Sequence, residues 1–296
     1  MNLLVGILLI VTSAAAFGTL GILGRFAYAA GLDTLTLMAL RFSLAALVLL
    51  VMLAIRHERL PRGGTLIRLV GMGAVGYVGQ AFAYLSALKY ASPGLVALLL
   101  YLYPVFVVIL SVIWNHEPVN RVKVLALGLA LIGVALTVGP EGGQLPGILL
   151  AISAAAIYSV YIIVGTKVMQ QVSAFQSSAV IFFSAGVTSS LLMTVNGVHL
   201  PKAGTGWIVI AAIVVIATVF PVVTFLAGLR RIGATNAAML STLEPVVTVL
   251  LSALLLGEIL KPVTLLGGGL ILAAVLVLMR SEMRRSALEQ VGEGHS

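Results

Sequence analysis

The sequence is poor in charge and has no cysteine. Charged residues make up 9% of its 296 residues, against about 25% in an ordinary soluble domain. So few charges cannot cover a surface that faces water, and we conclude that lipid surrounds most of the chain. The lack of cysteine excludes disulfides, thiolate catalysis and metal sites built from cysteine.

Further absences narrow the range of activities. The four histidines lie in loops, at the ends of apolar segments or in the tail, and no two have the spacing of metal ligands. No phosphate-binding loop motif is present, so ATP is not expected to be the direct energy source. We therefore expect no metal and no cofactor. Nor does the net charge of +8 indicate a nucleic-acid partner, because the basic residues are spread over short loops.

Long apolar segments are what the sequence has in abundance. Several approach or exceed the ~20 residues that cross a bilayer as a helix, and they are continuous rather than alternating, which excludes a β-barrel. The first begins at Leu3 with no basic segment before it, and we expect it to be a retained helix. The predicted fold is all-α and polytopic, with ten transmembrane helices at 3–24, 34–55, 66–88, 93–114, 120–138, 146–167, 174–195, 206–229, 234–256 and 262–280.

The basic residues of the loops predict the orientation of these helices, because cytoplasmic loops carry an excess of lysine and arginine. With both termini in the cytoplasm, twelve basic residues lie inside and four lie outside. The inside group is Arg56, Arg59, Arg62, Arg68, Arg121, Lys123, Lys167, Arg230, Arg231, Arg280, Arg284 and Arg285; the outside group is Arg25, Lys89, Lys202 and Lys261.

The second half of the chain repeats the first. A shift of 141 residues places 95–118 on 236–259, and a shift of 140 places the SAAA of 13–16 on that of 153–156. We predict one five-helix repeat in residues 1–139 and a second in 145–281, followed by a polar cytoplasmic tail, 282–296, in which we expect 284–296 to be disordered. Five is an odd number, so the two repeats must enter the membrane from opposite sides. Inverted repeats are typical of secondary transporters that work by alternating access.

Several residues in this pattern resemble the EamA branch of the drug/metabolite transporter superfamily. They are the central proline of each fourth helix, Pro104 and Pro245, the Gly257–Glu258 ending, and the opening stretch 14–27. The first repeat departs from the ending, with His116–Glu117. The resemblance implies ten helices, a central cavity and export of small metabolites. The family includes exporters of amino acids, aromatic ones among them.

Glu244 is the only acidic residue that we place well inside a predicted helix. It precedes Pro245, which leaves a backbone carbonyl free one turn back. We interpret Glu244 as a ligand for a substrate ammonium group or as a proton-carrying site. The alternative is a structural glutamate bonded to neighbouring helices, since an unpaired charge in lipid is costly. The repeat places Tyr103 at the equivalent position.

A tyrosine near the end of a membrane helix is more often an interface anchor, and the tyrosines of this chain lie mostly in the middle of predicted helices, which weakens that alternative. Three side chains of the third helix share one face, at i, i+3 and i+7, and two of the sixth share a face at i and i+3. Aromatic walls with a few convergent polar atoms suit a small-molecule pocket. Together with Glu244, the predicted substrate-binding residues are Tyr77, Gln80, Tyr84, Tyr101, Tyr103, Tyr158 and Tyr161.

Other polar and small residues are given structural roles. Arg41 lies about one turn into the second helix and is either an anchor for a substrate carboxylate or, as we favour, an arginine that snorkels to the outer interface. Glu117 and Glu258 end their helices, and we expect each to cap the helix that follows. Glycines spaced by three, beginning at Gly18 and at Gly73, indicate tight helix packing.

These observations favour an exporter of small metabolites in the bacterial inner membrane. Amino acids with aromatic or apolar side chains are the expected substrates, and drugs or other metabolites are the alternative. Phosphate-bearing substrates would need several basic residues in the core, which offers at most Arg41. No catalytic cluster suggests an enzyme, and no filter segment suggests a channel. Facilitated diffusion and proton antiport both stay open. The expected partners are the small-molecule substrate and the lipid bilayer, with no nucleic acid; the oligomeric state stays open, and a monomer is one option.

Overall fold

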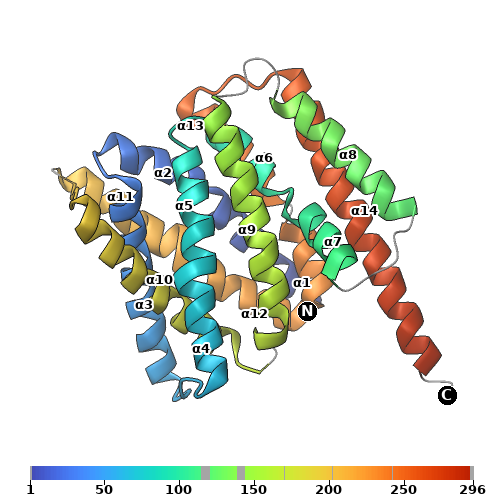
Figure 1. Cartoon of the computed structure of the whole chain (residues 1–296), viewed down its shortest axis with the longest axis horizontal. Coiled ribbons are helices and arrows are strands. Elements are labelled where there is room, and N and C mark those ends of the chain that lie inside the picture. The colour runs from blue at the N-terminus through green and yellow to red at the C-terminus, as the bar shows by residue number, and fades with distance from the viewer. Residues whose placement is uncertain are drawn as a thin grey trace.

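The computed structural model of the chain is a bundle of helices (Figure 1). It describes residues 2–114, 121–138, 144–169, 171–201, 203–241 and 243–293, and no strand occurs among them. The predicted all-α class is therefore confirmed. In chain order the elements are α1 (Asn2–Gly18), α2 (Leu20–Ala29), α3 (Thr34–Ile55), α4 (Gly64–Gly71), η1 (Met72–Tyr77), α5 (Val78–Ala87), α6 (Pro93–Leu100), α7 (Tyr103–Trp114), α8 (Arg121–Val138), α9 (Leu145–Met169), α10 (Ala174–Asn196), α11 (Gly204–Val214), η2 (Val215–Val219), α12 (Phe220–Ser241), α13 (Leu243–Leu256) and α14 (Pro262–Glu293).

Within the part of the chain that the structure describes, ten apolar helical segments overlap the ten predicted ones. Six are long and apolar enough to cross a bilayer, and four are shorter, so a count of ten crossings stays a prediction. The six are Leu4–Ala29, Thr34–Ile55, Gly64–Ala87, Leu145–Gly165, Ala174–Asn196 and Gly204–Gly228; the four are Pro93–Val107, Val124–Leu136, Leu243–Leu256 and Pro262–Val277.

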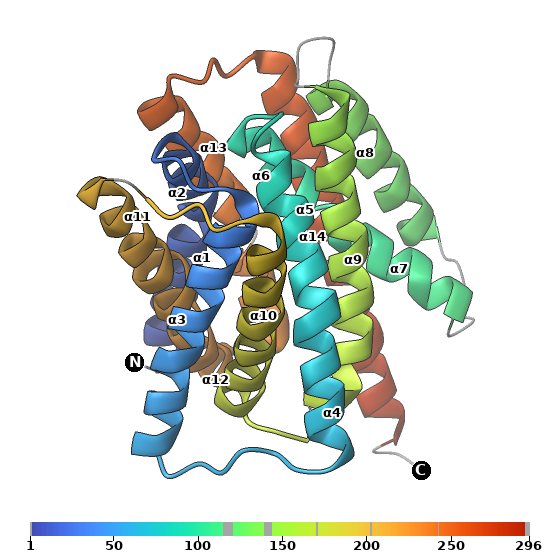
Figure 2. The ribbon, with the colours of Figure 1, turned by 60° about the vertical axis from the view of Figure 1, so that its left-hand side comes forward.

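Connections that the orientation argument put on one side of the membrane meet at one end of the bundle. Polar contacts join them: Arg25 Nη1 donates to the Leu88 carbonyl at 2.8 Å, the Gln144 backbone amide donates to the Tyr90 carbonyl at 3.1 Å, and His199 Nδ1 lies 3.9 Å from Asp33 Oδ1. The α3–α4 connection and the turn before α10 meet at the opposite end, which is the lower end in Figure 2. Helices that alternate in direction produce this grouping.

The helices pack in pairs that the 141-residue shift exchanges. The shift relates α3 to α10 and α8 to α14, and in each case the two related helices lie against one another; Figure 1 shows α8 and α14 side by side. It also relates α1 to α9. The helices that pack against these two correspond as well, because α12 packs against α1, α5 packs against α9, and the shift takes the region of α5 to α12. The two π-helical segments η1 and η2 occupy corresponding places as well.

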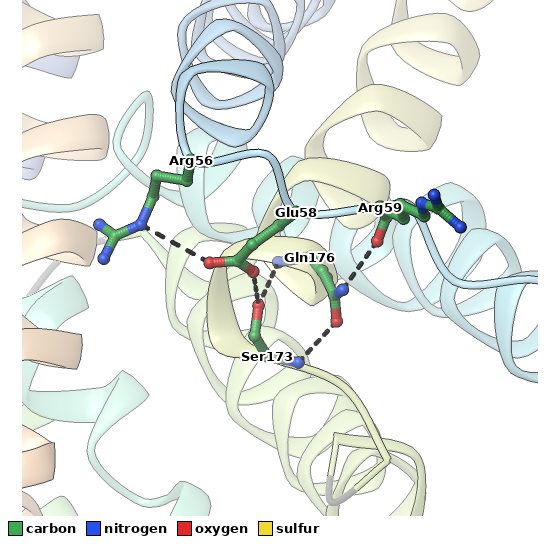
Figure 3. Close-up of polar contacts among 5 residues, drawn as sticks. All are labelled: Arg56, Glu58, Arg59, Ser173 and Gln176. Atoms are coloured by element: carbon green, nitrogen blue, oxygen red, sulfur yellow. Dashed lines mark hydrogen bonds and ion pairs between the residues drawn. The ribbon is translucent and has the colours of Figure 1, made fainter.

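Polar contacts tie the two ends of the α3–α10 pair in the same reciprocal way. At one end, drawn in Figure 3, Ser173 caps the start of α10 and its hydroxyl donates to Glu58 Oε2 at 2.5 Å. At the other end, Asp33 caps the start of α3 and pairs with His199. The 141-residue shift takes Glu58 to His199, and a shift of 140 takes Asp33 to Ser173. The N-terminal cap of α10 therefore contacts the segment that follows α3, and the N-terminal cap of α3 contacts the segment that follows α10.

The end drawn in Figure 3 carries further contacts. The Gln176 side chain accepts from the Ser173 amide, which completes a capping box, and its Nε2 donates to the Arg59 carbonyl at 2.7 Å. Arg56 lies 3.6 Å from Glu58, and its guanidinium lies 4.5 Å from the centre of the Phe175 ring. These contacts hold the α3–α4 connection against α10.

Close helix packing at glycines is confirmed at both places where it was expected. A methyl group at Gly18 would lie 2.9 Å from the carbonyl oxygen of Glu244, so α1 and the start of α13 approach at backbone distance. At Gly73 of η1 the Ile181 backbone of α10 is equally near, because a methyl group there would lie 2.9 Å from the Ile181 Cα. Any larger side chain at either position would separate the helices.

Two expectations about helix ends were wrong. We expected a loop at 230–233, but α12 continues through it to Ser241. Phe225 and Leu240 both pack against Ile10. Ile10 of α1 therefore contacts side chains from both ends of α12.

The second wrong expectation concerns the polar tail. We expected 284–296 to be disordered, but within that stretch residues 284–293 are the last turns of α14. The reason is local, because Glu, Arg, Ala, Leu and Gln dominate this stretch. These are strong helix formers, and they extend a helix that is already nucleated.

Candidate functional site

The site is built around a proline that lies in the first turn of a helix in each repeat. In the first repeat, α6 ends at Leu100 and α7 begins at Tyr103, one residue before Pro104. In the second, α13 begins at Leu243, two residues before Pro245. Proline has no amide hydrogen to donate and is tolerated only in the first turn of a helix, so each proline favours a new helix start just before it. These helix starts place Tyr101 and Tyr103 close to Pro104 in the first repeat and Glu244 beside Pro245 in the second.

Tyr101 and Glu244 are joined directly. The Tyr101 hydroxyl lies 3.1 Å from Glu244 Oε2 and 2.5 Å from the Ser241 carbonyl oxygen, and it donates to both acceptors. Tyr101 is only 4% exposed. A buried hydrogen bond between a phenol and a carboxyl group therefore bridges the two halves of the chain.

From Tyr101 a row of aromatic rings crosses the bundle. Neighbouring rings lie 4.9–5.9 Å apart between centres, within the range of favourable edge-to-face and offset contacts. The order is Tyr101, Tyr103, Tyr158, Tyr161 and Tyr77, and these residues come from the α6–α7 break, α7, α9 and η1. Helices from both halves therefore contribute to one aromatic wall.

The row continues past Tyr77 to a cation. The Tyr77 ring lies 5.4 Å from Phe182 of α10 and 5.3 Å from Phe42 of α3. The Arg41 guanidinium lies 5.2 Å from the centre of the Phe42 ring, within the distance of a cation–π contact. One end of the aromatic row thus meets a carboxyl group, and the other meets a guanidinium.

Electrostatics connect most of the predicted site residues to Glu244. Its carboxyl group interacts electrostatically with Tyr77, Tyr84, Tyr101, Tyr103 and Tyr158. Tyr161 joins this group through its ring contacts. Gln80 is half-buried between Tyr77 and Tyr84 along the helix. The structure thus brings the predicted tyrosines and Glu244 together, while their role in binding stays a prediction.

Arg41 does not snorkel, contrary to the interpretation we favoured. It is only 3% exposed, and its Nε donates a 2.9 Å hydrogen bond to Thr218 Oγ1 in η2. The Thr218 hydroxyl in turn donates to the Ile213 carbonyl, five residues back, as the π-helical turn allows. The acceptor that stabilises the buried Arg41 is Thr218, from the other half of the chain, so no residue close to Arg41 in the sequence indicates this contact.

The repeat gives this contact a counterpart of different chemistry. Residues 41–43 read RFS and residues 182–184 read FFS, so the 141-residue shift takes Arg41 to Phe182. The same shift takes Tyr77 to Thr218. Arg41 meets Thr218, and Phe182 meets Tyr77. Equivalent positions therefore touch in both halves, with a polar pair in one and an aromatic pair in the other.

Glu258 does not cap the helix that follows it, so that expectation was wrong. Its carboxyl oxygens accept from the hydroxyls of Ser92 and Ser252. Ser92 is the N-cap of α6, so Glu258 supports the start of a different helix, which only the tertiary fold brings near. Glu117, its counterpart, lies outside the described residues.

A groove of about 430 Å³ between α3 and α10 lies apart from these residues. Its walls include the exposed side chains of Leu47, Phe183 and Leu191. An exposed apolar surface on a membrane helix pair is suited to contact with lipid chains. We therefore do not place a substrate site in this groove.

The fold and the buried polar site define a multi-pass membrane transporter. The family model described as the EamA-like transporter family matches the chain twice, over residues 4–139 and 145–280. The chain therefore belongs to the EamA-like transporter family, and the resemblance drawn from its sequence is confirmed.

Individual relatives agree with this assignment. An "Uncharacterized transporter" of Archaeoglobus fulgidus is 29% identical over 92% of this chain and 95% of its own length. An "Aromatic amino acid exporter YddG" of Ancylobacter novellus is 33% identical, but over only 30% of this chain and 33% of its own. A solved structure titled "Crystal structure of protein" has a TM-score of 0.66 and 22% identity, and it covers 94% of this chain and 98% of its own. At that identity the last likeness concerns the fold alone.

Proposed function

We propose that the chain is a secondary transporter that exports amino acids with aromatic or apolar side chains across the bacterial inner membrane. The observation that carries this proposal is the Tyr101–Glu244 hydrogen bond at the end of a buried aromatic row. The name of the distant relative, an aromatic amino acid exporter, supports it. Drugs and other metabolites are the alternative cargo, whereas a membrane enzyme or a channel has no specific observation in its favour.

The ammonium group and the side chain of such a substrate each have a matching group in the site. Glu244 accepts the ammonium group, and the neighbouring tyrosine faces add cation–π attraction. Tyr103, Tyr158 and Tyr161 offer flat apolar faces to an aromatic or aliphatic side chain. Tyr101 fixes the position of the Glu244 carboxyl group through its hydroxyl. The substrate path runs along the third, fourth and ninth membrane helices.

Alternating access is the proposed mechanism, with two inverted five-helix repeats in residues 1–139 and 145–281 and both termini in the cytoplasm. The reciprocal helix pairs, the two family matches and the grouping of connections at one end support this arrangement. Rocking of one repeat against the other would open the site to each side in turn. A monomer contains both repeats and is sufficient.

Energy coupling is proposed to run through Glu244 as a proton antiport, with facilitated diffusion as the alternative. A carboxyl group that binds either a proton or an ammonium group exchanges one for the other during the cycle. No other carboxyl group of the described residues interacts with the tyrosine row.

The test is efflux from proteoliposomes that contain the purified full chain and a panel of labelled amino acids. We expect efflux of phenylalanine, tyrosine or leucine well above that from protein-free vesicles. No flux for any zwitterion in the panel would overturn the proposed substrate class. Efflux of an uncharged drug or sugar in the same vesicles would favour the alternative cargo.

A further inference from the structure

Arg41 is buried and, among the described residues, makes one hydrogen bond. A guanidinium carries five N–H donors and stays charged in proteins. In Arg41 one donor, Nε–H, is used by Thr218. Among the described residues, neither terminal nitrogen has a hydrogen-bond acceptor and no carboxylate forms an ion pair with the guanidinium. We propose that Arg41 is the carboxylate-binding group of the substrate site.

The terminal nitrogens of Arg41 are open to a ligand. Among the described residues, no fully occluded side-chain nitrogen or oxygen lacks a hydrogen-bond partner. The unpaired nitrogens of Arg41 therefore border a space that water can enter, although the side chain as a whole is 3% exposed. A carboxylate in that space would satisfy two N–H donors at once, in the bidentate geometry that favours arginine over lysine.

Protein stability does not account for a charge at this place. Isolated buried charges are costly, and apolar residues of similar size often replace buried ionic groups without loss of stability. The chain carries out this replacement itself, because Phe182 occupies the equivalent position of the other repeat and packs on Tyr77. The retained arginine, without a protein counter-ion among the described residues, therefore indicates that the counter-ion arrives with the substrate.

Thr218 and the nearby rings orient the guanidinium. The Thr218 hydroxyl is fixed by its bond to the Ile213 carbonyl, so it holds the Nε edge and leaves the opposite edge free. The Phe42 ring lies 5.2 Å from the guanidinium and restricts its movement further. Thr218 is thus a positioning residue for Arg41.

Arg41 and Glu244 together give the site one cation and one carboxyl group. Tyr77 and Tyr84 interact electrostatically with both, so both charges lie close to the same tyrosines. This inference rests on the proposed function and deepens it, because it makes the carboxylate of the substrate a requirement. An amine of the same shape that lacks a carboxylate would gain nothing from Arg41.

The experiment compares L-phenylalanine with phenethylamine, which lacks the carboxylate, in proteoliposomes of wild type and Arg41→Phe. The variant installs the residue that the other repeat uses. We expect phenylalanine efflux to fall at least tenfold, as expected for loss of a charge-assisted hydrogen bond, while phenethylamine efflux stays within twofold. Arg25→Gln, which changes an arginine at the end of the bundle, is the control. Arg41→Gln and Thr218→Val repeat the test if Arg41→Phe does not fold.

Three results would separate the two proposals. Equal phenylalanine efflux in wild type and in a folded Arg41 variant overturns the role of Arg41 and leaves the proposed function standing. If wild type moves no amino acid but moves benzoate or another carboxylate in an Arg41-dependent way, the amino-acid proposal fails and Arg41 keeps its role. If wild type moves no compound that carries a carboxylate, the role of Arg41 is overturned.

Discussion

The hydroxyl of Tyr101 donates a 3.1 Å hydrogen bond to Oε2 of Glu244, which lies 143 residues further along the chain. The two residues lie near Pro104 and Pro245, each of which is in the first turn of a helix, so the same sequence feature in each repeat accompanies one partner. Their contact makes the boundary between the repeats polar, within a bundle that is otherwise largely apolar.

Tyr101→Phe should lower the rate of amino-acid efflux about tenfold, because a hydrogen bond to a charged group contributes about 1.5–3 kcal/mol. The ring and its contact with Tyr103 are retained, so stability should change little. Initial efflux rates from proteoliposomes measure the effect. Tyr90→Phe, an exposed tyrosine at the end of the bundle, is the matched control and should transport as wild type. An unchanged rate in Tyr101→Phe would remove Tyr101 from the site.

Glu244→Gln should abolish the pH dependence of net efflux, because an amide cannot carry the proton that antiport requires. Loss of transport alone would not separate coupling from binding, so substrate exchange between two sides at equal pH is measured in the same vesicles. Retained exchange with lost pH dependence supports coupling at Glu244. Glu58→Gln, in the α3–α4 connection, is the control. Net efflux whose pH dependence survives in Glu244→Gln would reject proton coupling at this residue.

Tyr158→Ala should raise the KM for phenylalanine more than the KM for alanine. Its ring lies 4.9 Å from Tyr103 and 5.9 Å from Tyr161, and an aromatic pair contributes about 0.5–1.5 kcal/mol beyond the area it buries. The expected rise for phenylalanine is about 3- to 10-fold. Tyr158→Phe should restore it. Equal changes for phenylalanine and alanine would mean that the row does not recognise the side chain.

Ser252→Ala should destabilise the folded chain by about 1–3 kcal/mol, because it leaves an oxygen of the half-buried Glu258 without its partner. The thermal unfolding midpoint in detergent measures the loss. Ser153→Ala, which changes an exposed serine of α9, provides the comparison and should unfold as wild type. A Ser252→Ala variant as stable as wild type would show that Glu258 does not hold α6 and α13 together.

The sequence predicted the helices and the tyrosine faces because both follow from local periodicity. Apolar length locates a helix in lipid, and spacings of three and four residues put Tyr77 and Tyr84 on one side of it. The predicted helices 93–114 and 234–256 were drawn as continuous, whereas the structure starts α7 at Tyr103 and α13 at Leu243, as proline's missing donor favours.

The errors about Arg41 and Glu258 concern residues whose partners lie far away in sequence. Arg41 is compatible with snorkelling until Thr218, from the second half, is placed beside it. Glu258 fits the local capping rule as a sequence, yet in the fold its carboxyl group accepts from Ser92, the cap of a different helix. The alignment of RFS with FFS was the one available signal for Arg41, since it set a charge against an apolar residue at equivalent positions.

The central claim is that substrate binds in the tyrosine row between the two repeats, and the absence of native cysteine allows a direct measurement. Single cysteines at Gln80, Tyr101 and Tyr158 are labelled with a membrane-impermeant thiol reagent applied to each side of the membrane, with and without phenylalanine. We predict that they react from water and that phenylalanine slows the labelling. If all three stay unreactive from both sides in every condition, the site does not lie where the structure gathers these residues.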